Sequence, residues 1–224
     1  MRLSEADVRR GLPRPTGVGL RYVDGEVADV PPLFPGEDEA LGPRAVPQRR
    51  MLYALGRAAA RDALQQLGVA PVAIGRGAGG QPLWPAGIVG AISHTRSIVV
   101  ALVGWQRDYV GLGVDVEELG RGVDARIARL VARPSEMAWV NPEAGIERLI
   151  MLFSAKESVF KALYPAEQVW FGFSDAELTW DPERQVFSAE LLKALGERFP
   201  AGSRLQVPCT LGPDWVCSTA FVPA

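Results

Sequence analysis

The sequence predicts an α+β protein built from two lobes of similar size, and three observations lead to this class. The chain has 224 residues, of which 48% are hydrophobic and 22% charged, the usual balance for a globular chain with a sizeable core. Each half of the chain carries one long helical pattern. Each half also carries several short apolar runs bounded by turn-forming residues, which is typical of strands in small sheets.

The first half opens with a segment rich in Pro and Gly, residues 1–46, in which short strands and loops are expected. A helix is predicted from Pro47 to Leu67, because Pro suits a first turn, alanines fill the middle and Gly68 suits the C-terminal cap. At about 100° per residue, three arginines fall on one side of this helix. They are Arg50, Arg57 and Arg61.

Three strands are predicted next, close together along the chain. The runs G-I-V-G-A-I-S and I-V-V-A-L-V-G are apolar and partly β-branched, and S-H-T-R-S joins them. A third strand is predicted at 110–117. The second half is expected to hold, in order, a helix at 123–132, a long helix from Asn141-Pro142-Glu143 to about Tyr164, strands F-S-D-A-E-L-T-W and Q-V-F-S-A-E-L, a short helix at 190–198 and a closing hairpin of L-Q-V-P-C-T-L and W-V-C-S-T-A-F-V.

Composition and charge argue against several classes of protein. The formal net charge of −2 disfavours a dedicated nucleic-acid binder, although the segment 44–61 carries only basic charges. No apolar run reaches membrane-spanning length, and the N-terminus M-R-L-S-E-A-D-V-R-R lacks the apolar core of a signal peptide, so a cytoplasmic protein is expected. The single histidine, His94, rules out an H-E-x-x-H site, and Cys209 and Cys217 are expected to be free structural thiols.

The run G-R-G-A-G-G at 75–80 matches the glycine pattern of dinucleotide-binding turns. That pattern binds a pyrophosphate only where it opens a helix. Here Pro82 and Pro85 follow at once, and they would break such a helix. The segment is therefore interpreted as a loop.

Two acids stand in the third predicted strand, within V-G-L-G-V-D-V-E-E. Side chains alternate along a strand, so Asp115 and Glu117 point to the same face. They could simply face water at the edge of a sheet, which is the commoner arrangement for this pattern alone. They could also hold Mg²⁺, which prefers carboxylate oxygens and leaves room for water and phosphate.

Glu157 lies on the apolar side of the long predicted helix. Its neighbours at helical spacing form one stripe: Ile146, Ile150, Phe153, Phe160 and Tyr164. A capping box with Ser154 is disfavoured because Ser154 would be mid-helix, and a surface pair with Lys161 requires a solvent-exposed face. A carboxylate on the core side costs several kcal/mol unless it is paired or bound to a metal. A functional role for Glu157 is therefore favoured.

His94 stands at the predicted end of a strand between Ser93 and Thr95. A lone histidine is more often structural than a ligand. The two flanking hydroxyl groups make phosphate binding an equal alternative, and the spacing does not decide between them.

Two pairs of motifs resemble a known family. G-V-D-V-E followed by F-S-A-K-E-S-V-F-K-A resembles the paired signature of the 4′-phosphopantetheinyl transferases. P-L-W-P-x-G-x-x-G-x-I-S-H-T and R-A-V-P-Q-R-R resemble the bacterial subgroup associated with siderophore synthetases, the enterobactin-synthetase type. The resemblance covers roughly residues 40–175, with the motifs in the right order.

The resemblance implies a monomer of two pseudo-twofold-related lobes, each a small sheet packed on a long helix. It places the phosphate and adenine contacts of coenzyme A in an N-terminal lobe at 1–108, and the metal-binding acids and catalytic helix in a C-terminal lobe at 109–224. The metal would be Mg²⁺, with Mn²⁺ as an alternative. The implied reaction moves the 4′-phosphopantetheine arm of coenzyme A onto a serine of an acyl, aryl or peptidyl carrier protein and releases adenosine 3′,5′-bisphosphate.

The resemblance also implies roles for individual residues. It matches Asp115, Glu117 and Glu157 to metal-binding acids, with Glu157 also as the base that takes the proton of the serine. It matches Lys161 to a catalytic lysine beside the pyrophosphate. Further phosphate or coenzyme A contacts are implied for Arg49, Arg57, Arg76, Ser93, His94 and Lys156.

The chain departs from some relatives at Gly79 and Gln81, where those relatives place lysines near the ribose phosphate of the adenosine. Arg49 and Arg57 would then supply most of the grip on the 3′-phosphate.

The carrier protein would be acidic, so its docking surface should be basic or apolar. The segment 121–145 is one candidate, because it holds several basic and apolar residues: Arg121, Arg126, Arg129, Arg133, Met137 and Trp139. An ordinary solvated helix face is an equal alternative. Two other functions also remain open: another magnesium-dependent phosphohydrolase or nucleotidyltransferase, and a non-catalytic nucleotide-binding module.

Overall fold

The computed structural model describes residues 2–13, 16–23, 30–42, 44–120, 127–140 and 145–224, and it confirms the α+β class. The elements of the first half are α1 (Glu5–Val8), β1 (Thr16–Tyr22), η1 (Asp38–Ala40), α2 (Pro47–Gln66), β2 (Gly75–Arg76), β3 (Pro82–Leu83), β4 (Ile88–His94) and β5 (Ile98–Trp105). Those of the second half are β6 (Tyr109–Glu118), α3 (Ala128–Val131), α4 (Ile146–Glu167), η4 (Phe173–Asp175), β7 (Ala176–Asp181), β8 (Val186–Leu191), β9 (Arg204–Leu211) and β10 (Trp215–Pro223).

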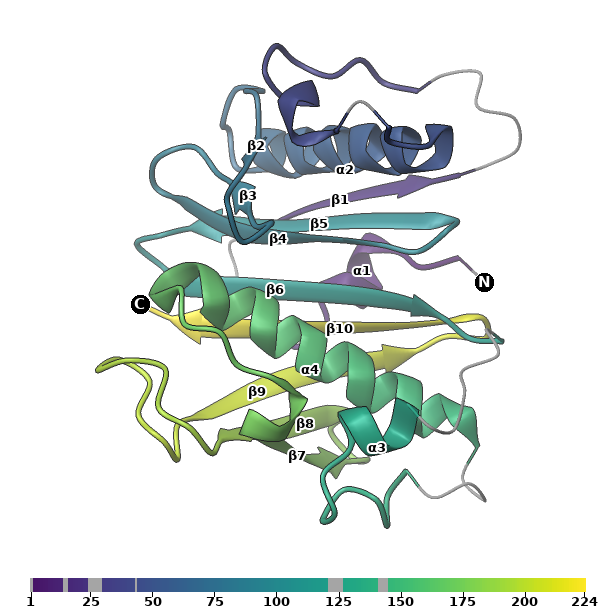
Figure 1. The fold of residues 1–224 in the computed structure, drawn as a ribbon, viewed down its shortest axis with the longest axis vertical. Coiled ribbons are helices and arrows are strands. Elements are labelled where there is room, and N and C mark those ends of the chain that lie inside the picture. Colours follow the sequence, from purple (N-terminus) through teal and green to yellow (C-terminus); the bar gives the residue numbers. More distant parts are fainter. Residues whose placement is uncertain (1, 14–15, 24–29, 43, 121–126, 141–144) are drawn as a thin grey trace.

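Two antiparallel sheets form the framework, and each carries one long helix (Figure 1). The first has the strand order β1-β5-β4 and packs against α2. The second has the order β6-β10-β9-β8-β7 and packs against α4. The strands β2 and β3 pair only with each other, and the glycine-rich segment between them forms a turn, as predicted.

The helix α2 begins and ends where its sequence predicts. Pro47 occupies the first turn, and the chain leaves the helix through Leu67 and Gly68, which has a φ of +75°. Its alanine-rich middle is buried against the first sheet. Small side chains allow a helix to approach a sheet closely, and two strand glycines carry this further.

Gly17 and Gly19 of β1 lie directly under the backbone of α2. A Cβ atom at Gly17 would stand 2.0 Å from the carbonyl oxygen of Ala63, and one at Gly19 would stand 1.8 Å from that of Ala59. Only glycine permits this approach of helix and strand backbones.

The second lobe repeats this contact. A Cβ at Gly111 of β6 would stand 2.0 Å from the carbonyl oxygen of Ala162, and one at Gly113 would stand 1.9 Å from that of Ser158. In both lobes a G-x-G strand meets helix residues four apart and in the same direction. This is a short structural repeat that the sequence analysis did not identify.

The two sheets meet along β4 and β6, which lie side by side without ladder hydrogen bonds (Figure 1). A shared apolar core spans this seam and includes Leu102 of the first sheet and Leu112 of the second, both almost fully buried. The hydroxyl of Ser93 on β4 bridges the seam by donating to Asp115 and accepting from the amide of Val116. The seam therefore holds polar groups beside a packed core.

Several predicted boundaries differ from the structure. The long helix begins at Ile146, after Gly145 at its N-cap, and continues to Glu167, while the predicted start at 141–143 lies outside the described residues. Of the helix predicted at 123–132, the described part contains only the four-residue α3. The helix predicted at 190–198 is wrong. After β8 the chain bends instead, and Leu195 donates its amide to the carbonyl of Phe199.

Cys209 and Cys217 are free and buried, as predicted, and burial raises the pKa of both thiols. Within the part of the chain that the structure describes, no helix combines the length and the apolar character needed to cross a membrane. The closing hairpin of β9 and β10 is confirmed, and β10 also pairs with β6. The strand that carries the predicted acids is thus held in the middle of the molecule.

Candidate active site

Asp115 is the centre of a polar cluster at the seam. Its side chain is buried, and Oδ1 accepts hydrogen bonds from Nζ of Lys161 at 2.7 Å and from Oγ of Ser93 at 2.8 Å. Lys161 also donates to Oγ of Ser93 at 2.9 Å. The three side chains come from β6, α4 and β4, so the cluster ties the catalytic-helix candidate to both sheets.

The second carboxylate oxygen of Asp115 is buried, and none of the residues that the structure describes donates a hydrogen bond to it. An orphaned buried oxygen of this kind is costly unless a donor or a cation satisfies it. Ammonium donation to Oδ1 offsets part of the charge, but it leaves Oδ2 open. Asp115 therefore retains one oxygen able to accept a ligand.

Glu157 lies on the same side of α4 as Lys161, one helical turn earlier. Its carboxyl is largely buried, and burial raises the pKa of Glu157 above its usual value. The positive charge of Lys161 opposes this shift, whereas the negative charge of Asp115 adds to it. The net effect of this environment is to favour the protonated form of Glu157.

Glu117 shares a face of β6 with Asp115, as the alternation predicts, and it is only partly buried. Among the described residues, however, no group of three His, Cys, Asp or Glu side chains is gathered closely enough to hold a metal ion. The predicted convergence of all three acids is thus absent from this structure. Lys161 supplies the positive charge beside Asp115 instead.

The residues nevertheless fit a hard divalent cation. The charge of Asp115 disfavours the ionised form of Glu157, and Oδ2 of Asp115 has no hydrogen-bond partner among the described residues. Mg²⁺ prefers oxygen ligands of this type and needs only one or two carboxylates from the protein. Glu117 could complete the set.

A cleft of about 260 Å³ lies between α4 and the hairpin of β2 and β3. Glu157 and Lys161 line one side of it, together with Phe160 and Tyr164. The first lobe contributes Arg76, Gly79, Gly80, Gln81, Pro82, Gly90, Ala91 and Ile92. This "lobe cleft" brings both predicted catalytic side chains to one surface.

Residue 79, where some relatives have lysine, lies close to the side chain of Tyr164. A Cβ atom at this position would stand 2.1 Å from the hydroxyl oxygen of Tyr164. A side chain at residue 79 would therefore require the ring of Tyr164 to move. Gln81 also lines the lobe cleft, and its buried Oε1 has no hydrogen-bond partner.

A second pocket, of about 390 Å³, adjoins the lobe cleft and is here called the arginine pocket. Four predicted phosphate contacts line it: Arg49, Arg57, Arg76 and His94. It shares Arg76, Gly80, Pro82 and Ile92 with the lobe cleft, so the two spaces adjoin. An anion in the arginine pocket could therefore belong to a ligand that also reaches Glu157 and Lys161.

Arg57 is partly committed to the protein itself. It donates from Nε to the carbonyl of Ile74 at 2.8 Å and from Nη2 to that of Gly75 at 3.1 Å. Its guanidinium stacks over the ring of Tyr53, and burial lowers the pKa of Arg57. Arg57 thus holds the β2 segment in place while lining the arginine pocket.

The two arginines that share the predicted helix side with Arg57 have other roles. Arg61 forms a buried ion pair with Glu37, with N and O atoms 2.9 Å apart. Arg50 is exposed and donates to the carbonyl of Ala45. Of the three, only Arg57 lines the arginine pocket.

Lys156 corrects the sequence analysis. It was predicted to contact phosphate, but its ammonium is buried and donates to Glu136, to the carbonyl of Val131 and to the carbonyl of Phe173. All three donors are therefore used within the protein. The side chain leaves α4 about 100° away from that of Glu157 and meets α3 and η4 instead of the lobe cleft.

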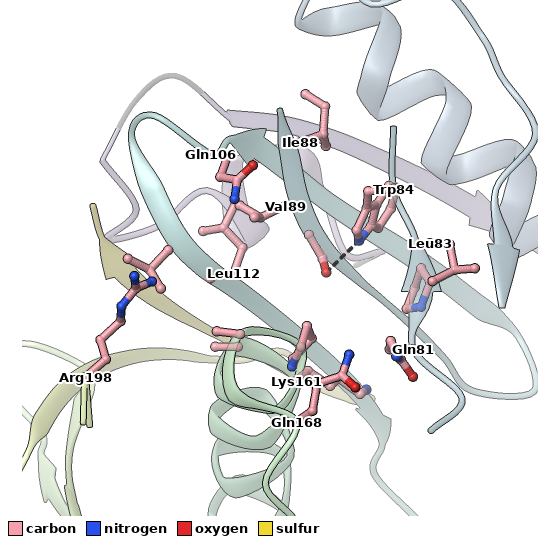
Figure 2. Close-up of a pocket in the computed structure, with 17 residues that line it drawn as sticks. Gln81, Leu83, Trp84, Ile88, Val89, Gln106, Leu112, Lys161, Gln168 and Arg198 are labelled. Carbon is pink, nitrogen blue, oxygen red and sulfur yellow. Dashed lines mark hydrogen bonds between the residues drawn. The ribbon is translucent and has the colours of Figure 1, made fainter. Parts of the chain in front are cut away.

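A groove of about 340 Å³ extends beyond Lys161 toward the end of α4. Figure 2 shows its apolar floor, with Trp84, Val89 and Leu112, and polar side chains around it. Trp84 is fixed by a hydrogen bond from its indole to the carbonyl of Gly90. The groove adjoins the lobe cleft, because the two share Gln81, Pro82, Gly90, Lys161 and Pro165 in their linings.

Two kinds of residue near the site were not predicted from the sequence to have the positions that the structure gives them. Phe160 and Tyr164 were assigned to the apolar stripe, but they also line the lobe cleft, with their rings stacked 5.1 Å apart. Their spacing from Glu157 was the available signal. Glu136 was not singled out, because nothing in its local sequence indicates that it meets Lys156.

Comparisons with known proteins agree on one family. The family model for the 4′-phosphopantetheinyl transferase N-terminal domain matches residues 37–104, and that for the 4′-phosphopantetheinyl transferase superfamily matches residues 111–219. The chain is 40% identical over 177 residues to 4′-phosphopantetheinyl transferase Svp of Streptomyces mobaraensis, covering 76% of this chain and 70% of the relative.

Two further relatives show the same likeness. 4′-Phosphopantetheinyl transferase PptT of Mycobacterium tuberculosis is 39% identical over 161 residues, which cover 70% of each chain. Enterobactin synthase component D of Escherichia coli is 33% identical over 149 residues, which cover 64% of this chain and 68% of the relative.

Proposed function

The chain belongs to the 4′-phosphopantetheinyl transferase superfamily and is an enzyme that transfers phosphopantetheine, and we propose that it moves this group from coenzyme A to a serine of an apo carrier protein. The resemblance found in its motifs is confirmed at the level of the family. The observation that carries the proposal is that the arginine pocket adjoins the lobe cleft, where Glu157 and Lys161 lie.

Coenzyme A would bind with its phosphates in the arginine pocket and the adjoining lobe cleft. Arg49, Arg76 and His94 would contact the 3′-phosphate and the pyrophosphate, and Arg57 would add the part of its guanidinium that the β2 segment leaves open. Arginine suits this role because its planar fork matches phosphate oxygens. Ser93 and Lys161 would hold the pyrophosphate at the seam.

Glu157 would act as the base. It would take the proton of the serine hydroxyl, whose oxygen forms a bond to the phosphorus that carries the pantetheine. The bond from that phosphorus to the bridging oxygen breaks, and adenosine 3′,5′-bisphosphate leaves with the electron pair. Lys161 would stabilise the charge that develops on the departing phosphate. A base buried beside apolar rings is suited to this because burial raises the pKa of Glu157.

Mg²⁺ is the proposed metal, with Mn²⁺ as a substitute, and Asp115, Glu157 and Glu117 are its proposed ligands. When bound, it would neutralise and orient the pyrophosphate. The unpartnered Oδ2 of Asp115 supports this assignment. Lys161 would then share Asp115 with the metal.

The carrier protein is expected to dock beside α3. Leu130 is 74% exposed there, and Ile127 and Met137 are also exposed, with Arg129 between them. An acidic helical carrier would find apolar contacts and a positive charge on this face.

The remaining residues of the predicted docking surface divide into three groups. Arg133 is committed to an ion pair with Glu177 on β7, with N and O atoms 3.2 Å apart. Trp139 does not belong to the exposed face, because it packs against Trp180 and Phe187. Arg121 and Arg126 lie outside the described residues.

We also infer that the functional boundary between the lobes falls at residues 108 and 109. The separate family matches on either side and the β5–β6 turn support this division. A monomer is proposed, since one chain supplies all the residues that line the arginine pocket and the lobe cleft.

A mass measurement tests the function. Incubation with coenzyme A, Mg²⁺ and an apo carrier protein should add about 340 Da to the carrier if phosphoryl transfer takes the proposed course. A panel of acyl, aryl and peptidyl carriers would identify the partner. Absence of any mass shift across the panel, together with hydrolysis of free nucleotides, would favour a phosphohydrolase; binding of coenzyme A without any reaction would favour a binding module.

A further inference from the structure

The ion pair between Lys156 and Glu136 is buried more completely than any ion pair at the proposed active site. Each side chain is 2% exposed, and Nζ lies 2.7 Å from Oε2. Burial lowers the pKa of Lys156, while the hydrogen bond and the charge of Glu136 oppose that shift. Burial of two charges carries a large desolvation penalty, so such a pair is stable only when its remaining donors and acceptors are also hydrogen-bonded.

The pair joins four segments that are separate in sequence. Lys156 of α4 donates to the carbonyl of Val131 at the end of α3 and to that of Phe173 at the start of η4, both at 2.9 Å. Glu136 accepts from the amide of Arg133 and, through its other oxygen, from the amide of Leu178 on β7, both at 2.7 Å. Figure 1 shows α3 beside α4, and α3 contacts both α4 and η4. One ion pair thus fixes the positions of several backbone groups at once.

The fixed segments border the catalytic side of α4. Lys156 directly precedes Glu157 in the chain. Phe173, whose carbonyl Lys156 holds, packs its ring on Phe153, with centroids 5.6 Å apart. Phe171 packs on Phe160 at 5.2 Å. Phe153 and Phe160 flank Glu157 on α4, so the segment 171–173 forms a wall beside the proposed base.

Stability alone is a weak reason for this pair. Replacing a buried ion pair with well-packed apolar residues is often neutral or stabilising, whereas removing one partner is strongly destabilising. What a fully bonded pair supplies is one defined arrangement of the groups around it. Here those groups belong to the segment beside the proposed docking face and to the wall next to Glu157.

We propose that Lys156 and Glu136 are a positioning pair that sets the α3–Glu136 segment and the 171–173 wall relative to Glu157, and so controls how the carrier serine meets the base. This inference rests on the proposed function. It assigns the pair to the acceptor side of the reaction, because the arginine pocket is built from α2, β4 and the β2–β3 hairpin, none of which the pair contacts.

The test is the double variant Lys156→Met/Glu136→Leu, which removes both charges and keeps apolar volume. We expect it to remain folded in a thermal melt and to bind coenzyme A in calorimetry with a dissociation constant within about threefold of the parent. We expect kcat/KM for the carrier to fall about a hundredfold, since small misplacements of reacting groups carry penalties of that order. A role in stability alone would not divide the two substrates in this way.

The matched control removes an exposed ion pair of the same length. Arg204→Met/Glu190→Leu deletes a pair on β8 and β9, also with N and O atoms 2.7 Å apart. It should leave kcat/KM for both substrates unchanged. Parental kcat/KM for the carrier in the buried double variant would overturn the inference, and so would an equal loss of coenzyme A affinity.

If the double variant does not fold, Lys156→Arg provides the second measurement. It keeps the charge, but its planar fork cannot reach three acceptors placed around an ammonium. The same selective loss toward the carrier is expected, and full activity would overturn the inference. If the parental chain itself transfers nothing to any carrier, the proposed function fails instead, and the positioning role fails with it.

Discussion

Nζ of Lys161 on α4 donates to Oδ1 of Asp115 on β6, with the two atoms 2.7 Å apart, and both residues contact Oγ of Ser93 on β4. The lysine side chain is 24% exposed and the aspartate side chain 4%, so the ammonium lies at the boundary between the buried acid and the lobe cleft. A cation in this position can neutralise Asp115 at rest and still face a bound pyrophosphate.

Lys161→Ala should therefore lower turnover more than it raises the KM for coenzyme A. The charge matters most when the departing phosphate gains negative charge, so kcat should fall about a hundredfold. Steady-state kinetics with a saturating carrier would measure both constants. Lys193→Ala is the matched control, because this exposed lysine contacts only the carbonyl of Trp170 among the interactions described, and it should leave both constants at parental values. A Lys161→Ala enzyme with normal kcat and raised KM would assign the lysine to binding alone.

Glu157→Gln should abolish transfer, with a fall in kcat of at least about a thousandfold, because the amide cannot accept the serine proton. Coenzyme A binding should stay within about tenfold, since most of the proposed phosphate contacts lie elsewhere. Mass spectrometry of the carrier and calorimetry with coenzyme A would provide the two readouts. Retention of full transfer by this variant would show that another group is the base.

The same substitution should change how stability depends on pH. The pKa of Glu157 is raised in the folded protein, so the folded state binds its proton more tightly than the unfolded state does. The parent should therefore lose stability as pH rises from the ordinary glutamate pKa through the raised one. Glu157→Gln lacks this titration, so in metal-free buffer its stability relative to the parent should increase over that pH window. Denaturant melts of both proteins at acid and neutral pH would test this, and a constant difference would contradict it.

Arg49→Gln should weaken binding of coenzyme A but not of 3′-dephospho-coenzyme A. The 3′-phosphate is the anion assigned to the arginine pocket, so the KM for coenzyme A should rise about tenfold. Arg50→Gln is a close control, because Arg50 is the next residue but donates to Ala45 and does not line the pocket. If both nucleotides lose affinity equally, Arg49 contacts the pyrophosphate or the adenine instead.

Removal of divalent metal with EDTA should stop transfer, and Mg²⁺ or Mn²⁺ should restore it. Asp115→Asn should raise the Mg²⁺ concentration needed for half-maximal activity, because it removes a charged oxygen ligand. Asp62→Asn is the control, since Asp62 is an exposed acid paired with Arg21. Transfer that persists undiminished in EDTA would overturn the assignment of a metal.

The sequence predicted those elements in which local pattern and burial agree. The helix α2 has proline at its start, alanines inside and glycine after it, and each of these choices favours the same boundaries. The strands β4 and β5 are mostly apolar because they lie in the middle of the molecule, and β6 is apolar up to Asp115. The short helix at 190–198 did not form because a helical pattern of between two and three turns is too short to be stable unless tertiary contacts support it. Here the chain instead satisfies its backbone through Leu195 and Phe199.

The candidate site was predictable only as far as one helix or strand can indicate. The periodicity of α4 placed Glu157 and Lys161 on one side, and the alternation of β6 placed Asp115 with Glu117. The role of Lys156 depended on Glu136, which reaches it from a separate segment. No helical projection shows which partner covers a given side of a helix, so the lysine next to the proposed catalytic glutamate was predicted to contact phosphate.

The glycines at 111 and 113 have a consequence for what mutations can do to this enzyme. They touch the carbonyls of Ala162 and Ser158, which directly follow Lys161 and Glu157 in the chain. The depth at which the two reactive groups sit is thus fixed by main-chain contact and hardly by neighbouring side chains. Substitutions elsewhere in the core can be accommodated by repacking of side chains. A single added methyl group at either glycine would instead push this turn of α4 away from β6, and so move Glu157 and Lys161 together away from Asp115.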